Sequence, residues 1–189
     1  MATDLKDYIR CYDGIVPATF CQSIMDTFDK SPHTEYLDRE CRPTFTELNI
    51  SQRYGAKDPA WVGIQNKLTN YFIDAVELYM RDLDVEIDFP AEYAFEENRV
   101  KMYQANNHDQ FKDHVDVGNY NSARRFLVCF LYLNDVTLGG ETNFPKLRHS
   151  ITPERGRILV FPANWQYRHS GQPPLSGPKY IVGSYLHYL

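Results

Sequence analysis

The segment Arg125–Leu133, with the sequence RFLVCFLYL, places the strongest constraint on the fold. Its side chains are apolar at successive positions, whereas a strand with one solvated face alternates between apolar and polar residues. A run of this length and composition is typical of a strand that is covered on both sides. We therefore predict that this segment lies centrally in a sheet, with other parts of the chain packed on each face.

Other short segments in the second half of the chain also have strand-like composition, and Gly, Pro and Asn separate them. The further predicted strands are Arg99–Ala105, Phe111–Val117, Arg157–Phe161 and Tyr180–Tyr188.

The first half of the chain has a helical pattern instead. In VPATFCQSIMDTFDKS, Phe20, Ile24 and Phe28 recur every four residues after Pro17, which suits a first helical turn. A second helix is predicted to begin at Asp58 and Pro59, with one apolar face formed by Trp61, Ile64, Leu68, Phe72, Ala75 and Tyr79. The stretch from His33 to Lys57 is polar and irregular, with some β-like pieces, and is predicted to be a loop or lid near a site. Helices followed by short strands predict an α+β chain, in which the strands form a double-sheet barrel or jelly roll backed by the two helices.

Length and charge limit the functional classes. A chain of 189 residues is expected to form one domain, 1–189, with helical support over about 1–90 and the jelly-roll core over about 95–189. The net charge of −5 and the pI of about 5.7 argue against binding to bulk nucleic acid or to an anionic membrane. The sequence has no apolar run of transmembrane length, and MATDLKDYIRCYDG lacks the features of a signal peptide.

The cysteines point to a reducing environment. The four, Cys11, Cys21, Cys41 and Cys129, show no Cys-x-x-Cys pairing, and Cys129 lies inside the apolar run. We expect reduced thiols in an intracellular, cytoplasmic protein, whose oligomeric state the sequence leaves open.

The stretch FKDHVDVG sets His114 and Asp116 one residue apart. In an extended chain both side chains would project from the same face, so they could be two ligands of one metal ion, although a surface turn also accounts for so short a motif. Two His and one carboxylate are the ligand set of non-haem Fe(II), and the third ligand would have to come from a distant strand. His33, His108 and His149 lie in polar or loop-like stretches, which leaves His169 and His187.

Lys179 opens a strongly β segment. The ammonium group of a lysine at this position either reaches solvent or pairs with an anion inside the barrel, because burying an unpaired charge costs free energy.

Taken in order, these motifs resemble the 2-oxoglutarate- and Fe(II)-dependent dioxygenases, above all their prolyl 4-hydroxylase-like branch. The resemblance runs from about Glu96 to His187 and rests on the HVD motif, YLNDVTLGGETNFP, GRILVFP, His169 and, ten residues on, Lys179. It implies a double-stranded β-helix (jelly roll) that binds Fe(II), 2-oxoglutarate and dioxygen, with ascorbate as a reductant. The implied metal ligands, which are also the catalytic residues, are His114, Asp116 and His169.

The resemblance also assigns cofactor and substrate contacts. It implies that Lys179 pairs with the distal carboxylate of 2-oxoglutarate, and that Thr142 and Tyr103 assist. The family pattern Tyr-x-x-Gly-x-x-Tyr before the first histidine is replaced here by YQANNHDQF, which has no Gly and a longer spacing. Substrate contacts are implied for Arg125, Tyr185 and His187.

The implied activity is hydroxylation of peptidyl proline, coupled to conversion of 2-oxoglutarate to succinate and carbon dioxide. We expect Leu127, Leu131 and Ile181 to line the pocket. A free amino acid or a different small molecule is the second substrate class that the motifs allow. A zinc hydrolase, a non-catalytic metal-binding jelly roll and a nucleic-acid oxygenase are the competing functional interpretations. The absence of a His-Glu-x-x-His helix argues against a zinc hydrolase. Lys179 argues against a nucleic-acid oxygenase, because demethylases usually have Arg at this position.

Overall fold

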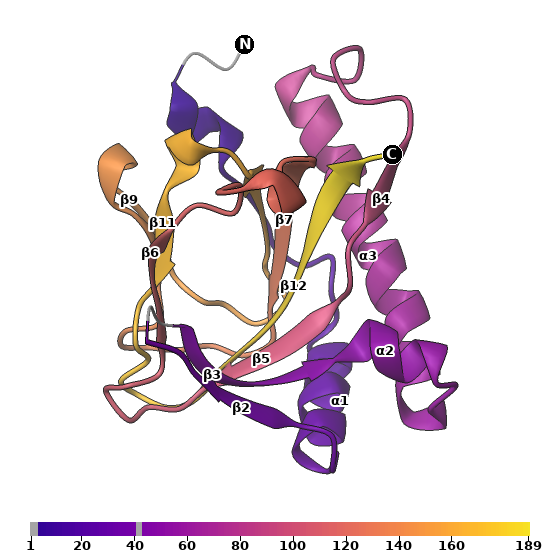
Figure 1. Ribbon diagram of the computed structural model, residues 1–189, viewed down its shortest axis with the longest axis vertical. Helices are drawn as coiled ribbons and strands as arrows, with labels where there is room; N and C mark the ends of the chain where they lie inside the picture. Colours follow the sequence, from indigo (N-terminus) through magenta and orange to yellow (C-terminus); the bar gives the residue numbers. More distant parts are fainter. Residues whose placement is uncertain (1–3, 41–42) are drawn as a thin grey trace.

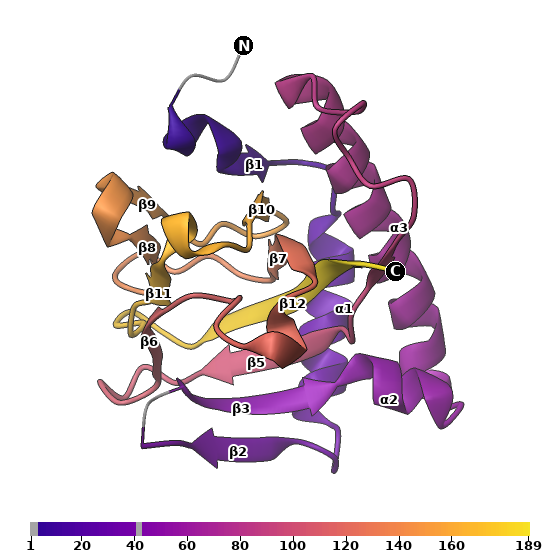
Figure 2. The same ribbon diagram turned by 45° about the horizontal axis from the view of Figure 1, so that its top comes forward.

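The computed structural model describes residues 4–40 and 43–189, and its central feature is one curled antiparallel sheet. The strands lie in the order β1-β10-β7-β12-β5-β3-β6-β11-β8-β9, with β2 added beside β3 and β4 beside β12. Figures 1 and 2 show the sheet bending round on itself, with the long helix α3 and the helix α1 packed against one outer face. This is the predicted α+β jelly-roll fold.

The first part of the chain contributes β1 (Arg10–Tyr12), α1 (Ala18–Asp29), β2 (Glu35–Asp38), β3 (Pro43–Asn49), α2 (Ile50–Gly55) and α3 (Pro59–Leu83). The second part contributes β4 (Tyr93–Phe95), β5 (Arg99–Tyr103), β6 (Gln110–His114), β7 (Arg125–Tyr132), β8 (Thr142–Phe144), β9 (His149–Ile151), β10 (Ile158–Pro162), β11 (His169–Gly171) and β12 (Lys179–Tyr188). Four short 3₁₀ turns, η1 (Leu5–Tyr8), η2 (Tyr120–Ser122), η3 (Pro145–Leu147) and η4 (Trp165–Tyr167), complete the described elements.

Both predicted helices form, for the reasons the sequence gives. The side chain of Asp58 accepts a hydrogen bond from the backbone N–H of Ala60 and caps α3, with Pro59 in its first turn. All six predicted face residues of α3 are buried. In α1 the buried residues include Phe20, Ile24 and Phe28, which is the predicted stripe.

The apolar run becomes β7, which lies between β10 and β12 and is covered on both faces. Its odd-numbered residues, such as Leu127 and Leu131, pack with the helices in one core cluster. Its even-numbered residues, such as Phe130 and Tyr132, belong to a second cluster inside the curl. The strand therefore separates the supporting core from the interior of the barrel, because successive side chains point to opposite faces.

The predicted loop from His33 to Lys57 is wrong for most of its length. It contains β2, β3 and α2, and β3 pairs with both β5 and β6, so that it completes the curl. The sequence pattern of β3 is weak because both of its faces mix polar and apolar residues. Phe45 is buried inside the curl and Leu48 against the helices, whereas Glu47 pairs with Arg99. Together with β1, these strands also show that the part from 1 to 90 is not only helical support.

The cysteines Cys11, Cys21 and Cys129 are free thiols, while Cys41 lies outside the described residues. Burial raises the pKa of Cys11 and of Cys21 to about 11, so these thiols are protonated and unreactive at neutral pH. Within residues 4–40 and 43–189, the helices are all too short or too polar to cross a membrane.

Candidate active site

Three of the predicted residues meet inside the curl. His114 ends β6 and His169 begins β11, and the two are directly paired in the antiparallel register, so that their imidazoles lie side by side. Asp116 follows β6 by two residues and turns back toward them. One ligand atom from each of the three lies within 4.8 Å of the others. Nε2 of His114 and Nε2 of His169 each lie 3.7 Å from a carboxylate oxygen of Asp116.

Hydrogen bonds to the backbone orient both imidazoles. Nδ1 of His114 donates to the carbonyl of Lys112 at 2.8 Å, and Nδ1 of His169 donates to the carbonyl of Tyr167 at 3.0 Å. Each ring therefore presents the bare lone pair of Nε2 to the centre of the site. Burial, with a further contribution from the neighbouring His169, lowers the pKa of His114 to about 4, so a proton does not compete for this nitrogen at neutral pH.

Two of the converging ligand atoms are buried without a hydrogen-bond partner, namely Oδ2 of Asp116 and Nε2 of His169. Buried polar atoms in folded proteins are nearly always satisfied, so such a pair facing one point requires an explanation. A divalent cation satisfies both atoms at once, and the neutral imidazoles with one carboxylate are the facial set suited to Fe(II). The residues present therefore fit an iron ion.

The Asp116 carboxylate is positioned from the last strand. Tyr185 on β12 donates its hydroxyl proton to Oδ1 of Asp116 at 2.9 Å, and the guanidinium of Arg125 lies 4.0 Å from the centre of the Tyr185 ring. Arg125 also donates to the backbone carbonyl of Asp116 at 3.3 Å. Two of the three predicted substrate contacts, Arg125 and Tyr185, thus hold Asp116 in place.

Glu96 is a residue that the sequence did not single out. It accepts two hydrogen bonds from Arg125, at 2.8 and 2.7 Å, and one of its oxygens lies 3.7 Å from Nδ1 of His187, the third predicted substrate residue. Most of the donors of Arg125 are therefore engaged within the protein. The only sequence signal was the placement of Glu96 at the start of the matching region, which gives no clue to its partner 29 residues away.

The predicted anchor Lys179 is 1% exposed at the start of β12. Its Nζ donates to the carbonyl of Gly140 at 2.8 Å and lies 4.7 Å from the ring centre of Tyr103, which is its cross-strand partner. No carboxylate of the described residues forms an ion pair with it, and burial lowers its pKa to about 7. A buried ammonium in this state fits an incoming carboxylate.

Thr142 stands beside this lysine at the start of β8, and its hydroxyl shares a 2.6 Å hydrogen bond with Tyr132. Tyr132 was missed because its position inside an apolar run gave no sign of a polar role. Lys179, Thr142 and Tyr103 line one cavity with His114 and His169, which we call the inner cavity.

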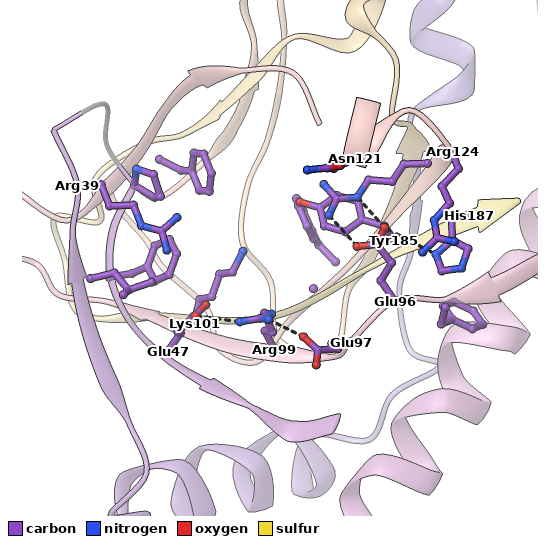
Figure 3. A pocket seen from close by; sticks show the side chains of 18 residues that line it. Arg39, Glu47, Glu96, Glu97, Arg99, Lys101, Asn121, Arg124, Tyr185 and His187 are labelled. Carbon is purple, nitrogen blue, oxygen red and sulfur yellow. Dashed lines mark hydrogen bonds and ion pairs between the residues drawn. The ribbon is translucent and has the colours of Figure 1, made fainter. Parts of the chain in front are cut away.

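A larger opening, which we call the groove, joins the inner cavity. It has a volume of about 710 Å³, and the two share Lys101, Phe111, Phe130 and Tyr185 as lining residues. Arg125 and His187 line the groove, as does Lys101, which the sequence reasoning also missed (Figure 3). The expectation for Leu127 and Leu131 is wrong, because both face the helices, whereas Ile181 does line the inner cavity.

The remaining histidines lie elsewhere. His33 is exposed, His149 lies on β9, and His108 pairs with Asp38 at 3.0 Å on the outside of the sheet.

Comparison with known proteins agrees with this geometry. Residues 99–187 match the family model described as the 2OG-Fe(II) oxygenase superfamily. The matched region, just under half of the chain, is similar to a 2OG-Fe(II) oxygenase domain. The match includes β5, β6, β7, β11 and β12, and so it contains the whole triad and Lys179.

Among curated proteins, prolyl 4-hydroxylase subunit alpha-1 of Gallus gallus is 28% identical over 94 residues. That match covers 41% of this chain but only 18% of the chicken protein, so the chain spans less than a fifth of that relative.

Solved structures with a similar fold over almost the whole chain include two prolyl hydroxylases. The viral collagen prolyl hydroxylase of Paramecium Bursaria Chlorella virus-1, in its 2OG complex, has a TM-score of 0.71 at 18% identity and covers 96% of this chain and 97% of that one. A Trichoplax adhaerens prolyl hydroxylase, in complex with a hypoxia inducible factor peptide fragment, has a TM-score of 0.70 at 13% identity, covering 96% and 84%.

Proposed function

We propose that this protein is an Fe(II)- and 2-oxoglutarate-dependent dioxygenase that hydroxylates proline within a peptide or protein, with residues 1–189 acting as one domain. The observation that carries the proposal is the pair of buried, unpartnered ligand atoms on Asp116 and His169, beside His114. The buried Lys179, whose charge lacks a carboxylate partner among the described residues, supports the 2-oxoglutarate part.

In this proposal His114, Asp116 and His169 hold the iron, and Lys179, Thr142 and Tyr103 hold the distal carboxylate of 2-oxoglutarate. When bound, iron with 2-oxoglutarate and dioxygen supplies an oxidative decarboxylation that releases succinate and carbon dioxide and transfers one oxygen atom to the substrate. Tyr185 keeps the Asp116 carboxylate in one orientation, and the apolar wall of Phe111 and Phe130 limits water around the reacting carbon. Ascorbate would serve as the reductant that returns oxidised iron to the ferrous state.

A peptide substrate is supported by the groove, which is open and large enough to accept several residues beside the metal site. The Trichoplax relative, with a similar fold, has been solved with a peptide fragment bound. We propose that Arg125, Tyr185 and His187 form the wall against which this peptide lies. His187 lines the groove, and its Nδ1 makes no hydrogen bond, with the nearest carboxylate oxygen of Glu96 at 3.7 Å.

The test begins with anaerobic titration of the purified protein with Fe(II) and then with 2-oxoglutarate. Succinate release and a mass gain of one oxygen atom are then measured with proline peptides, with neutral peptides lacking proline, and with free proline. Binding of both cofactors and oxidation of a proline peptide are expected. Oxidation of free proline with all peptides inert would overturn the peptide assignment, and failure to bind iron would overturn the proposal as a whole.

A further inference from the structure

Lys101 is the residue of the groove that the proposed chemistry leaves unexplained. It lies on β5, where Arg99, Lys101 and Tyr103 face the interior of the curl while Val100 and Met102 pack with the helices. Figure 3 shows its side chain reaching into the groove from the strand that also carries Arg99. Its ammonium lies 5.2 Å from the ring centre of Phe45 and 5.7 Å from that of Phe111.

Among the described residues this ammonium has no hydrogen bond and no ion pair, and burial lowers its pKa. Three carboxylates line the groove, and each forms its ion pairs with an arginine, although Glu47 is also the cross-strand neighbour of Lys101 and favours its charged form. Glu47 and Glu97 pair with Arg99, and Glu96 pairs with Arg125. The chain as a whole carries a net charge of −5, so an unpaired cation placed at this point is not a reflection of bulk charge.

The position of Lys101 relative to the metal site is fixed by Phe111. The Phe111 ring stacks on the His114 imidazole with centres 3.8 Å apart, and the Lys101 ammonium lies near the same ring. A negatively charged group bound by Lys101 would therefore sit beside the metal site, on the substrate residue that is oxidised or on its immediate neighbour.

The register of the sheet separates Lys101 from the 2-oxoglutarate anchor. Lys179 is paired with Tyr103, whereas Lys101 is paired with Ile181, two residues along β12. Two residues of a strand span roughly 7 Å. Lys179 lines only the inner cavity, whereas Lys101 also lines the groove, so the two lysines are placed to take different anions.

Two exposed cations extend the same charge along the groove. Arg39 and Arg124 both line it, and neither forms an ion pair with any described residue. They lie at opposite sides of the opening in Figure 3, with Lys101 deeper between them.

We propose that the substrate carries a carboxylate which pairs with Lys101, and that this carboxylate belongs to an Asp or Glu side chain next to the oxidised proline. The proposal rests on the function proposed above and narrows its substrate to acidic proline peptides. A bound carboxylate would give Lys101 an ion-pair partner and a charge-assisted hydrogen bond, which is about twice as strong as a neutral one.

The experiment measures the binding affinities of fluorescently labelled peptides that are blocked at both ends. The peptides are Ala-Glu-Pro-Ala, Ala-Pro-Glu-Ala and their Gln counterparts. The protein is loaded with Fe(II) and 2-oxoglutarate, and oxygen is excluded. Free proline and a peptide that ends in an unblocked proline test whether the carboxylate that Lys101 binds is the α-carboxylate of proline instead of an acidic side chain. The variants are Lys101→Met, which keeps the length of the side chain, and Lys101→Glu. Lys146→Met, at an exposed position outside the groove, is the control for net charge.

At least one Glu peptide is expected to bind about tenfold or more tightly than its Gln counterpart. Lys101→Met should abolish this preference, Lys101→Glu should reverse it in favour of the Gln peptide, and Lys146→Met should retain it. Raised salt should weaken the preference in the wild type. Lys146→Met should leave the affinity for 2-oxoglutarate and succinate release without substrate unchanged. Lys101→Met should still bind Fe(II) and 2-oxoglutarate while it loses the preference for the Glu peptide, which separates this result from failure of the proposed function.

Three outcomes would overturn the proposal. The first is equal binding of Glu and Gln peptides by the wild type. The second is a preference that survives in Lys101→Met. The third is a loss of 2-oxoglutarate affinity in Lys101→Met with peptide preference intact, which would make the cosubstrate the partner of Lys101. Preference for an unblocked proline carboxylate over a Glu side chain would reject the side chain as the source of the charge.

Discussion

Tyr185 donates its hydroxyl proton to Oδ1 of Asp116 across 2.9 Å, while Oδ2 of the same carboxylate is buried with no partner. The two oxygens therefore have different roles, since one is held by the protein and the other is directed toward the two imidazoles. Because Tyr185 lies on β12 and Asp116 follows β6, the orientation of the carboxylate depends on the closure of the curled sheet.

Removing this hydroxyl should weaken metal binding without removing a ligand. Tyr185→Phe is expected to lower Fe(II) affinity about 10- to 100-fold, as for other residues that orient a metal ligand, while 2-oxoglutarate affinity at saturating iron is unchanged. Tyr180→Phe is a matched control, because Tyr180 on the opposite face of β12 donates to Asp29 at 3.0 Å. Anaerobic equilibrium dialysis measures the affinities, and equal effects of the two variants would contradict the orienting role.

The ligands themselves should have a larger effect. His114→Ala, Asp116→Ala and His169→Ala are each expected to lower Fe(II) affinity by more than about a hundredfold, because each leaves the ion with two protein ligands. His33→Ala, at an exposed position, should bind iron normally. Retention of iron by His169→Ala, with loss in His187→Ala, would show that the third ligand is misassigned.

Lys179→Met should act in opposite directions on cosubstrate affinity and on stability. Loss of the buried partner costs about 3 kcal/mol or more in 2-oxoglutarate binding, which is about a hundredfold in affinity. In the ligand-free protein the same change removes a buried charge that lacks a carboxylate partner, so the free energy of unfolding should be unchanged or raised by about 1–4 kcal/mol. Titration calorimetry and urea unfolding measure the two effects, and Lys146→Met is the charge control.

The same lysine gives a pH dependence of stability. Its pKa is about 7 in the folded chain, against an ordinary value of 10.5, because burial disfavours the charged form. Between these values the unfolded chain binds more protons, so this group makes the ligand-free protein more stable as pH rises from 7 to 10.5. The slope is at most about 1.4 kcal/mol per pH unit. Urea unfolding at several pH values should show it in the wild type relative to Lys179→Met, and parallel curves would contradict the burial of an unpaired charge.

Replacing side chains by alanine on the two faces of β7 should affect stability and ligand binding differently. Leu131→Ala is expected to lower the free energy of unfolding by about 2–5 kcal/mol, because Leu131 is fully buried against the helices. The folded variant should still bind Fe(II) and 2-oxoglutarate normally. Phe130→Ala opens the wall shared by the groove and the inner cavity, and should weaken 2-oxoglutarate binding as well. Thermal unfolding and calorimetry together distinguish the two.

The amino-acid sequence by itself determined the elements whose signals are local. The apolar run predicted a central strand, the capped periodic segments predicted α1 and α3, and the alternation in β12 placed Lys179, Tyr185 and His187 on one face. These features depend on side-chain spacing within one element, which is fixed at 3.6 residues per helical turn and two per strand repeat. The ordered motifs after Glu96 also predicted the family resemblance and the three residues that meet.

Only the tertiary structure decided which polar groups are paired across the sheet. Glu96 with Arg125, Tyr132 with Thr142, and Tyr185 with Asp116 each join separate segments of the chain. The insertion of β3 between β5 and β6 was equally hidden, because both of its faces mix polar and apolar residues. Strand order and register are set by the closure of the whole sheet rather than by any local pattern. That closure leaves Lys101 and Lys179 without ion pairs to carboxylates of the described residues. This could not be predicted from the sequence, because it depends on which strands become neighbours.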